Sequence, residues 1–363
     1  MPPRRRSRVA PTTASSVFPR QIPRATGTGA PVRRLARWGL TLGVALCVAL
    51  VVRQGVGNVA AAVAGVGSGI LAILLLHLAQ VAADGMGWRA VLAGEPRPPA
   101  GLFVWGRWIA ESVNDLLPVM GVGGNVVRAR ALAGAGIPGP TAGASVLVDI
   151  TVIMTTQLPV TLLGLGLLVA YFDAGALVGR VLLGVLVPGS MLAGFVLAQR
   201  RGLFGAGARL VERFVQTPAQ LGISGSAAAL DREVHRLYRN PGALLAAVAW
   251  HGLGWLIGTT EVWLTLHYLG HTLSFASAVM WQSLAEVVRT AAFFVPGALG
   301  VQEASYLVLG RLLGVPPDAA LALSLIGRAR DLIFGVPGLL AWRARVAAAP
   351  GSRRATRIAT EVE

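Results

Sequence analysis

Ionisable side chains occur inside segments that otherwise have the composition of membrane helices. They fall within or beside apolar blocks, at Glu111, Asp149, Glu261, Glu286, Arg289, Arg328 and Asp331. An ionised side chain at the centre of a membrane helix costs about 2.5–3.5 kcal/mol on insertion scales. Glu286 and Arg289 are three residues apart, as are Arg328 and Asp331, so each pair is predicted to neutralise itself on one helical face. Two uses remain open: the charges hold helices together, or some of them line a transport path.

The segment FFVPGALGVQE, residues 293–303, interrupts one of these apolar stretches. Pro296–Gly297 and Gly300 are predicted to break the helix, and Gln302 and Glu303 follow the break. Backbone that leaves the helix inside a membrane is tolerated only where it is buried in protein or lines a wet cavity. We therefore interpret this break as part of a substrate site.

A second broken stretch, AESVNDLLPVMGVGGNVVRARALAGAGIP, repeats the order of features in AEVVRTAAFFVPGALGVQEASYLVLGRLLGVP. The matching positions are Glu111 and Glu286, Asn114 and Arg289, Pro118 and Pro296, Gly121 and Gly300, and Pro138 and Pro316. A span with a buried ionisable group follows each stretch, Asp149 in the first and Arg328 in the second. The sequence therefore predicts an internal repeat.

The composition is that of a membrane protein, since 54% of the residues are hydrophobic and only 13% are charged, against about a quarter charged in soluble proteins. Apolar blocks predict full spans at about 36–53, 62–82, 142–171, 176–198, 243–269 and 319–342, and broken hairpins at 102–133 and 274–314. The fold class is thus all-α and polytopic, with six spans and two broken or re-entrant hairpins, or about eight helices. Because arginines cluster outside the blocks, the positive-inside rule places both termini in the cytoplasm. The two hairpins then open to opposite sides, which makes the repeat inverted and places the site near the midplane, where the breaks meet.

The domain organisation follows from these blocks. Residues 1–34 form a basic, disordered N-terminal tail, residues 35–345 the transmembrane domain, and residues 346–363 a C-terminal tail. A cytoplasmic loop at 199–241 contains DREVHRLYRNPGA, which is either an amphipathic helix on the membrane surface or a solvated linker helix.

The polar groups of the broken stretches suggest separate tasks. A guanidinium of Arg128, Arg289 or Arg328 matches the oxygens of a lipid phosphate, and the helix starts after Gly123–Gly124–Asn125 and after Gln302 direct N–H groups at an anion. A carboxyl of Asp149, Glu286 or Glu303 could exchange protons. The predicted substrate path comprises Glu111, Asn114, Arg128, Asp149, Glu286, Arg289, Gln302, Glu303, Arg328 and Asp331, and the predicted helix breaks are Pro118, Gly121, Gly123, Gly124, Pro296, Gly297 and Gly300.

Several other chemistries find no support in the sequence. Cys47 is the only cysteine, and His77, His251 and His267 lack the spacing of metal ligands, so neither a metal nor a cofactor is expected. The net charge of +16 comes from arginine alone among basic residues and indicates an anionic membrane face rather than nucleic acid. No catalytic motif is present, so the chain is not expected to be an enzyme.

The motifs together resemble a known family. RWIAESVNDLLPVMGVGGNVVRARAL and QSLAEVVRTAAFFVPGALGVQEASYLVLGRLLGVPPDAALALSLIGRARDLIFGVPGLLAW are similar to the flippase-like transmembrane domain of lysyl-phosphatidylglycerol synthases, and closest to its stand-alone hopanoid-biosynthesis-associated members. The likeness covers about residues 35–345 and is most specific over 281–342. It implies a bacterial inner-membrane protein that moves a lipid, with hopanoids as the suggested cargo.

Family motif positions carried over by this resemblance are Glu111, Asn114, Gly123, Gly124 and Arg128 in the first half, and Glu286, Arg289, Pro296, Gly300, Gln302, Glu303, Arg328 and Asp331 in the second. Asn125 occupies a position where the analogy with Glu303 predicts an acidic residue, which weakens any coupling role there. About 20 residues follow the last span, too few for an aminoacyl-transferring domain, so lipid aminoacylation is not expected.

The leading hypothesis is a lipid transporter that works by alternating access, with a hopanoid or a phospholipid as the membrane lipid it carries. The alternatives are a membrane-embedded lipid-modifying enzyme, which would need a nucleophile or metal constellation, and a scaffold for lipid-biosynthesis proteins, which would depend on the 199–241 loop and the basic tails.

Overall fold

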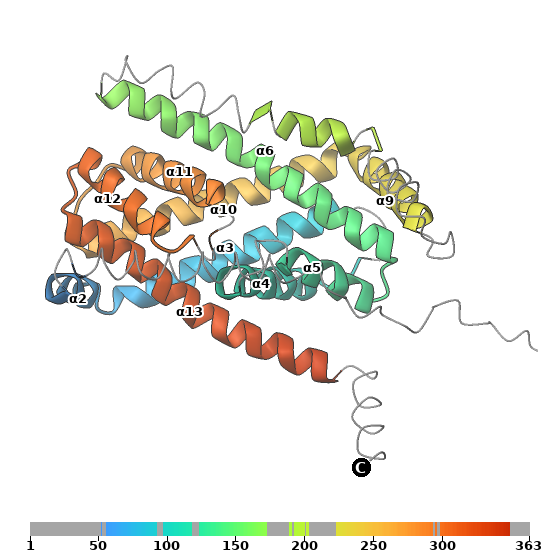
Figure 1. Ribbon diagram of the computed structural model, residues 1–363, viewed down its shortest axis with the longest axis horizontal. Helices are drawn as coiled ribbons and strands as arrows, with labels where there is room; N and C mark the ends of the chain where they lie inside the picture. The colour runs from blue at the N-terminus through green and yellow to red at the C-terminus, as the bar shows by residue number, and fades with distance from the viewer. Residues whose placement is uncertain are drawn as a thin grey trace, which may run out of the picture.

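The protein is built from helices. The structure, a computed structural model, describes residues 52, 56–92, 97–117, 123–172, 189–190, 192–199, 201–202, 223–292, 295 and 298–348, and no strand occurs among them. In chain order (Figure 1) the helices are α2 (Val56–Gly65), α3 (Gly69–Val91), α4 (Ala100–Leu116), α5 (Gly123–Gly134), α6 (Gly139–Phe172), α9 (Ile223–Tyr238), α10 (Pro241–Tyr268), α11 (Phe275–Ala291), α12 (Val301–Leu313) and α13 (Pro317–Ala348). Within the described part, α3, α6 and α10 are long and apolar enough to cross a membrane. The predicted all-α polytopic membrane protein is confirmed.

Two predicted spans differ from the helices observed. The span predicted at 62–82 is wrong in its bounds, because α2 ends at Gly65 and α3 begins only at Gly69. Gly67, in the turn between them, has a φ of +50°, a backbone conformation that favours glycine. The span predicted at 319–342 lies in α13, which has 32 residues but carries Arg328, Arg330 and Asp331 near its middle and is not among the three apolar helices. Apart from residue 52, the span predicted at 36–53 lies outside the described residues, as does most of 176–198.

Each broken stretch is a pair of helices, as predicted. The stretch 102–133 contains α4 and α5, and the stretch 274–314 contains α11 and α12. Gly123 begins α5, and Gly300 immediately precedes α12 with a φ of +78°, so the second break depends on glycine. The predicted break residues Pro118, Gly121, Pro296 and Gly297 lie outside the residues that the structure describes.

The helices form two matching sets, α3–α6 and α10–α13. The two leading helices, α3 and α10, pack against each other, and the sets then exchange partners: α4 packs on α13 and α11 packs on α6. In Figure 1 the α4–α5 hairpin lies toward the right of the bundle and the α11–α12 hairpin toward the left. The order of the helices and their crossed pairing match the internal repeat that the sequence predicts, and the inversion of its two copies stays a prediction.

The long closing helices of the two repeats carry an interior proline at the same place. Pro159 lies in α6 and Pro337 in α13, and 21 residues separate Pro138 from Pro159 and Pro316 from Pro337 alike. An interior proline removes one backbone hydrogen bond and favours a kink. Both repeats therefore place a weak point at the same position of their longest helix.

The crossed contacts use small residues in both places. A methyl group added to Gly164 of α6 would lie 1.8 Å from Ser283 Oγ of α11, and one added to Gly338 of α13 would lie 2.1 Å from Ser112 Oγ of α4. Helices in membranes associate through such close approaches because hydrophobic burial contributes little between them in lipid. The glycines thus allow the two repeats to interlock.

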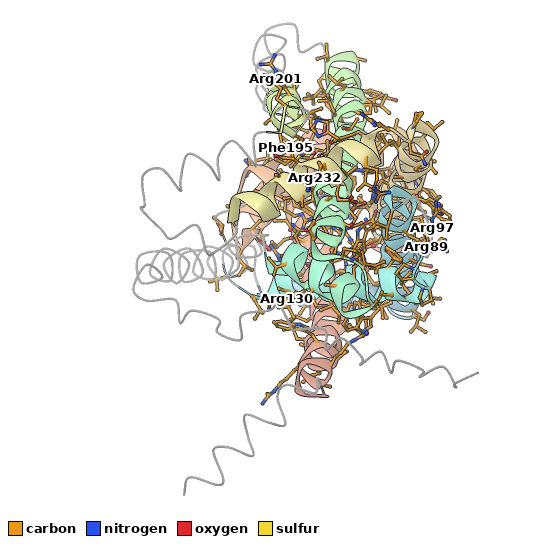
Figure 2. The ribbon with its side chains drawn as sticks, turned by 90° about the vertical axis from the view of Figure 1, so that its right-hand side faces the viewer. Arg89, Arg97, Arg130, Phe195, Arg201 and Arg232 are labelled. Carbon is orange, nitrogen blue, oxygen red and sulfur yellow. The ribbon has the colours of Figure 1, made fainter. Side chains whose placement is uncertain are left out.

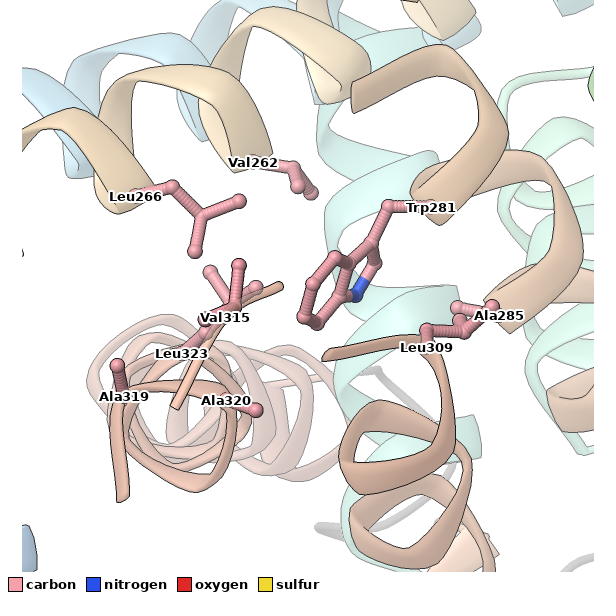
Figure 3. Packing of buried hydrophobic residues seen from close by; sticks show 9 residues of the cluster. All are labelled: Val262, Leu266, Trp281, Ala285, Leu309, Val315, Ala319, Ala320 and Leu323. Carbon is pink, nitrogen blue, oxygen red and sulfur yellow. The ribbon is translucent and has the colours of Figure 1, made fainter. Parts of the chain in front are cut away.

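Each repeat also has a core of its own. In the second repeat, Trp281 of α11 is fully buried and points toward Val262 and Leu266 of α10 and toward Val315 (Figure 3). In the first repeat, Trp88 and Phe103 are likewise fully buried, with their rings edge to face at 4.9 Å. These clusters pack α3, α4 and α5 together in the first repeat and α10, α11 and α12 together in the second.

Helix α9 confirms the helix predicted in the 199–241 loop but not its place on a membrane surface. Its apolar side chains Val234 and Leu237 are buried against Val91, Val148 and Ala247 of α3, α6 and α10. Because protein covers this face, it is not available to lipid. The following helix, α10, is capped by Asn240, whose side chain accepts a hydrogen bond from the backbone N–H of Ala243.

Arginines gather at one end of the molecule. Figure 2 faces the end that lies on the right of Figure 1 and labels Arg89, Arg97, Arg130, Arg201 and Arg232 there. Arg89 lies in the last turn of α3 and Arg130 near the end of α5. The described part of the chain therefore has one end that is rich in arginine.

Candidate functional site

A cavity of about 440 Å³ lies between the two repeats, with walls from α3–α6 and α10–α13. Seven of the ten predicted path residues line it: Glu111, Asn114, Arg128, Glu286, Arg289, Gln302 and Asp331. The other three, Asp149, Glu303 and Arg328, do not. The structure therefore divides the predicted set into residues that line the cavity and residues that lie away from it.

The C-terminal ends of α4 and α11, the first helices of the two hairpins, meet at this cavity. Arg289, at the end of α11, lies 3.7 Å from Asp115 at the end of α4, Nη1 to Oδ1. Arg289 also donates through Nε to Glu286 Oε2 at 2.9 Å and through Nη2 to Oε1 at 3.2 Å, so the predicted pairing of these two side chains is confirmed. The Arg289 side chain remains 49% exposed and Glu286 23%. This pair is accessible to a molecule in the cavity.

Glu111 of α4 occupies another part of the cavity wall. Its Oε1 lies 3.2 Å from His77 Nε2 of α3, and its Oε2 lies 3.8 Å from Arg107 Nε. Asn114, one turn further along α4, accepts a hydrogen bond from the backbone N–H of Gly124 at 2.9 Å. Thus Glu111 joins α4 to α3, and Asn114 fixes the approach of α5.

Asp149 and Arg128 form a buried ion pair that braces α5 against α6. Both side chains are almost completely buried, at 0% and 1% exposed, and Arg128 Nη2 donates to Asp149 Oδ2. The Arg128 guanidinium lies over the Trp88 ring, 4.3 Å from its centroid. Asp149 Oδ1 accepts from His251 Nε2 at 2.9 Å. One edge of Arg128 reaches the cavity wall, but its charge is committed to Asp149.

Glu303 and Arg328 form an ion pair between α12 and α13. Glu303 is fully buried, and its carboxylate accepts from the backbone N–H of Gly300 at 2.6 Å and from Arg328 Nε at 3.1 Å. The predicted pairing of Arg328 with Asp331 is therefore wrong, because Arg328 turns toward α12. Asp331 instead accepts from its neighbour Arg330, through Nε at 3.1 Å and Nη2 at 2.7 Å.

One backbone donor at each of the two helix starts is occupied by a side chain of the protein. The N–H of Gly124 donates to Asn114 Oδ1, and the N–H of Gly300 donates to Glu303 Oε2. These two donors are therefore satisfied within the protein, and the binding of a phosphate by the N–H groups that follow stays a prediction. Gln302, which donates to Ser324 Oγ at 3.3 Å, lies beside the second start and lines the cavity.

Sequence reasoning missed the polar face of α3. His77, Gln80 and Asp84 stand at positions i, i+3 and i+7, which places them on one side of this apolar helix. His77 and Gln80 line the cavity. Asp84 accepts from Arg107 Nη2 at 3.0 Å and lies 3.0 Å from His251 Nδ1. The spacing of these three polar residues in an otherwise apolar segment is the sequence signal for this face.

Every arginine that lines the cavity has a carboxylate partner. Arg107 pairs with Asp84 and Glu111, Arg128 with Asp149, Arg289 with Glu286 and Asp115, and Arg330 with Glu261 and Asp331. Among the described residues no group of three His, Cys, Asp or Glu side chains is placed to hold a metal ion. The site therefore offers paired charges and amides to a ligand.

The cavity wall also has an apolar side. This side is formed by Ile150, Ile153 and Met154 of α6. Gln157, one turn further on, adds an amide, as do Gln80 of α3 and Gln282 of α11. The arrangement suits a ligand with a polar, hydrogen-bonding part and an apolar part.

Comparison with known proteins identifies a family. A sequence profile of the family described as "Lysylphosphatidylglycerol synthase TM region" matches residues 38–338. No curated protein and no solved structure matches the chain. The resemblance inferred from the two broken stretches is confirmed at the level of this family, and the closer likeness to its hopanoid-associated members stays a prediction.

Proposed function

We propose that this chain, which belongs to the lysylphosphatidylglycerol synthase TM region family, carries a lipid across the membrane by alternating access around the cavity between its repeats. The observation that supports this is the meeting of the ends of α4 and α11, one from each broken hairpin, at a polar cavity in a membrane bundle. Secondary transporters bind their cargo at such breaks in inverted repeats. A cavity of about 440 Å³ is the size of a small-ligand site and suits a lipid head group.

The paired charges favour a head group that is neutral or zwitterionic. Each cavity-lining arginine already faces a carboxylate, so a bare phosphate would have to displace one of these partners. Hydroxyl groups, by contrast, can donate to carboxylates and accept from amides without breaking an ion pair. The apolar wall at Ile150, Ile153 and Met154 would face the hydrocarbon part of the cargo. We therefore propose a hydroxyl-rich lipid such as a hopanoid polyol ahead of an anionic phospholipid.

The orientation that we propose follows the arginines. The end that carries Arg89, Arg97 and Arg130 faces the cytoplasm of a bacterial inner membrane, with both termini on that side. The α4–α5 hairpin then opens to the cytoplasm and the α11–α12 hairpin to the opposite side. Rocking of one repeat against the other would expose the cavity to each side in turn.

Transport is tested with the purified protein in vesicles. The probes are three labelled lipids: a hopanoid polyol, phosphatidylethanolamine and phosphatidylglycerol. Movement of the hopanoid or of phosphatidylethanolamine ahead of phosphatidylglycerol supports the proposal. Preference for phosphatidylglycerol would overturn the assignment of the head group, and movement of none of the three would overturn transport of these lipid classes.

A deletion strain separates transport from biosynthesis. Total lipid should be unchanged while one lipid accumulates in the inner membrane, and wild type but not Glu286→Gln should restore its distribution. Loss of a lipid species, with normal distribution of the remainder, would instead indicate a lipid-modifying enzyme or an accessory protein of biosynthesis.

A further inference from the structure

Two histidines of the bundle each lie between two carboxylates. In the first, His251, both ring nitrogens have a hydrogen-bond partner. His251 of α10 is buried, with Nε2 2.9 Å from Asp149 Oδ1 and Nδ1 3.0 Å from Asp84 Oδ1. Ionised carboxylates only accept hydrogen bonds, so both ring nitrogens must carry a proton. His251 is therefore a fixed imidazolium that joins α3, α6 and α10.

The second histidine has the same surroundings but lacks one of the two bonds. His77 of α3 is 4% exposed, and its Nε2 lies 3.2 Å from Glu111 Oε1. On the other side, Nδ1 lies 3.9 Å from Glu261 Oε2, and neither of these two buried atoms has a hydrogen-bond partner. A second proton on His77 would make Nδ1 a donor, and a small approach of the two side chains would then give Glu261 Oε2 the hydrogen bond that it lacks.

The charges around His77 also leave room for one proton. The facing groups comprise an ion-paired network of Asp84, Glu111, Asp149, Glu261 and Asp331 with Arg107, Arg128, Arg330 and His251, and a neighbouring cluster in which Arg289 pairs with Asp115 and Glu286. Seven carboxylates therefore face four guanidiniums and one imidazolium. With His77 neutral these groups carry an excess of negative charge, and a proton on His77 reduces this excess, which is favourable in a low-dielectric interior.

His77 is also reachable from two cavities. It lines the central cavity, and it lines a second cavity of about 10 Å³, close to the size of one water molecule, between α4 and α13. Glu111, Asp115 and Asp331 line both cavities as well. A proton can thus approach the imidazole from the cargo side and leave it by way of Glu111.

We propose that His77 binds the proton that couples lipid movement to the proton gradient, an inference that rests on the proposed transport function. Uptake adds one proton at Nδ1, and the new N–H donates to Glu261 Oε2. This closes the gap between α3 of one repeat and α10 of the other. Release returns the proton to water, so no other reactant is needed. His251, with both bonds already made, holds the same helices together and does not titrate during transport.

Proton binding can be measured without any cargo. The full-length protein, labelled with ¹⁵N in its five histidines, is placed in lipid nanodiscs, and the imidazole ¹⁵N signals are followed between about pH 5 and 8, the range in which histidine usually changes charge. Single histidine variants assign the signals. His77 should change reversibly from one N–H to two, while His251 shows two N–H groups throughout. A His77 signal that stays constant over this range would overturn the proposal.

Coupling is measured in vesicles that enclose a pH-sensitive dye, with the labelled lipid that the transport assay identifies. For one proton per lipid, a gradient of one pH unit should drive about tenfold accumulation of lipid. His77→Gln should abolish this response, whereas the control His267→Gln, an exposed residue outside the network, should retain it. Gradient-driven accumulation by His77→Gln equal to that of wild type would refute the coupling site. Absence of lipid movement in wild type would instead refute the proposed function, and the nanodisc titration would still decide whether His77 binds a proton.

Discussion

Replacement of Asp149 by asparagine separates a structural carboxylate from one on the transport path. The wild-type carboxylate is fully buried and serves two partners, Arg128 and His251. Asp149→Asn leaves the Arg128 guanidinium buried without a countercharge, and breaking a buried ion pair in this way costs about 3–5 kcal/mol. Glu286→Gln removes a charge whose partner is half exposed, so its effect on stability should be about 0–1 kcal/mol.

The difference between the two variants is large enough to measure. A gap of at least about 2 kcal/mol corresponds to roughly thirtyfold in the unfolding equilibrium. Unfolding by SDS in mixed micelles, followed by tryptophan fluorescence, gives the free energy of unfolding of each variant. The double variant Arg128→Met/Asp149→Asn should recover more than half of the loss, because it removes the unpaired cation and leaves an amide oxygen for His251.

One result would refute this reasoning. If Asp149→Asn unfolds like wild type but no longer moves lipid, Asp149 belongs to the transport path. The ion pair with Arg128 would then not be the reason why an aspartate occupies position 149. Conversely, Glu286→Gln should lower transport with little change in stability, and a variant that fails to fold would show that the Glu286–Arg289 pair is structural.

Three further changes test the packing of the repeats. Gly164→Ala places a methyl group against Ser283 Oγ and should destabilise the fold by about 1–3 kcal/mol; the double variant Gly164→Ala/Ser283→Ala should unfold closer to wild type in the same SDS titration, and no recovery would refute the contact. Gly124→Ala places a methyl group 2.3 Å from the backbone carbonyl oxygen of Ala110, which cannot move away as a side chain can. We expect the free energy of unfolding to fall by about 1–3 kcal/mol and transport to become weaker. Wild-type behaviour in both assays would contradict the close approach of α4 and α5. Glu303→Gln removes the charge that Arg328 faces in the interior and should lower the unfolding free energy by about 3–5 kcal/mol; an unchanged value would place Glu303 in a functional rather than a structural role.

The broken hairpins show how far local sequence information reaches. Gly300 predicts the start of α12 because few other residues adopt its positive φ, and the proline-bounded apolar stretches predict α4–α5 and α11–α12 because helix breaking is a local property. The Glu286–Arg289 pair was predictable for the same reason, since residues three apart share a helical face. The bounds of α3 were less accessible, because the turn at Gly67 interrupts a stretch that is apolar on both sides.

The sequence by itself determined the membrane class, the family, the two breaks and the repeat. Hydropathy, helix-breaking residues and the order of motifs are local properties of the chain and do not depend on which helices pack together. Only the tertiary structure decided which charges meet. Arg328 could reach Asp331 in its own helix but pairs with Glu303 of α12. His77 lies beside Glu261, nearly two hundred positions away in the sequence. The partner of a buried charge depends on how helices cross in space, because each ionised group must find its countercharge wherever the packing places one.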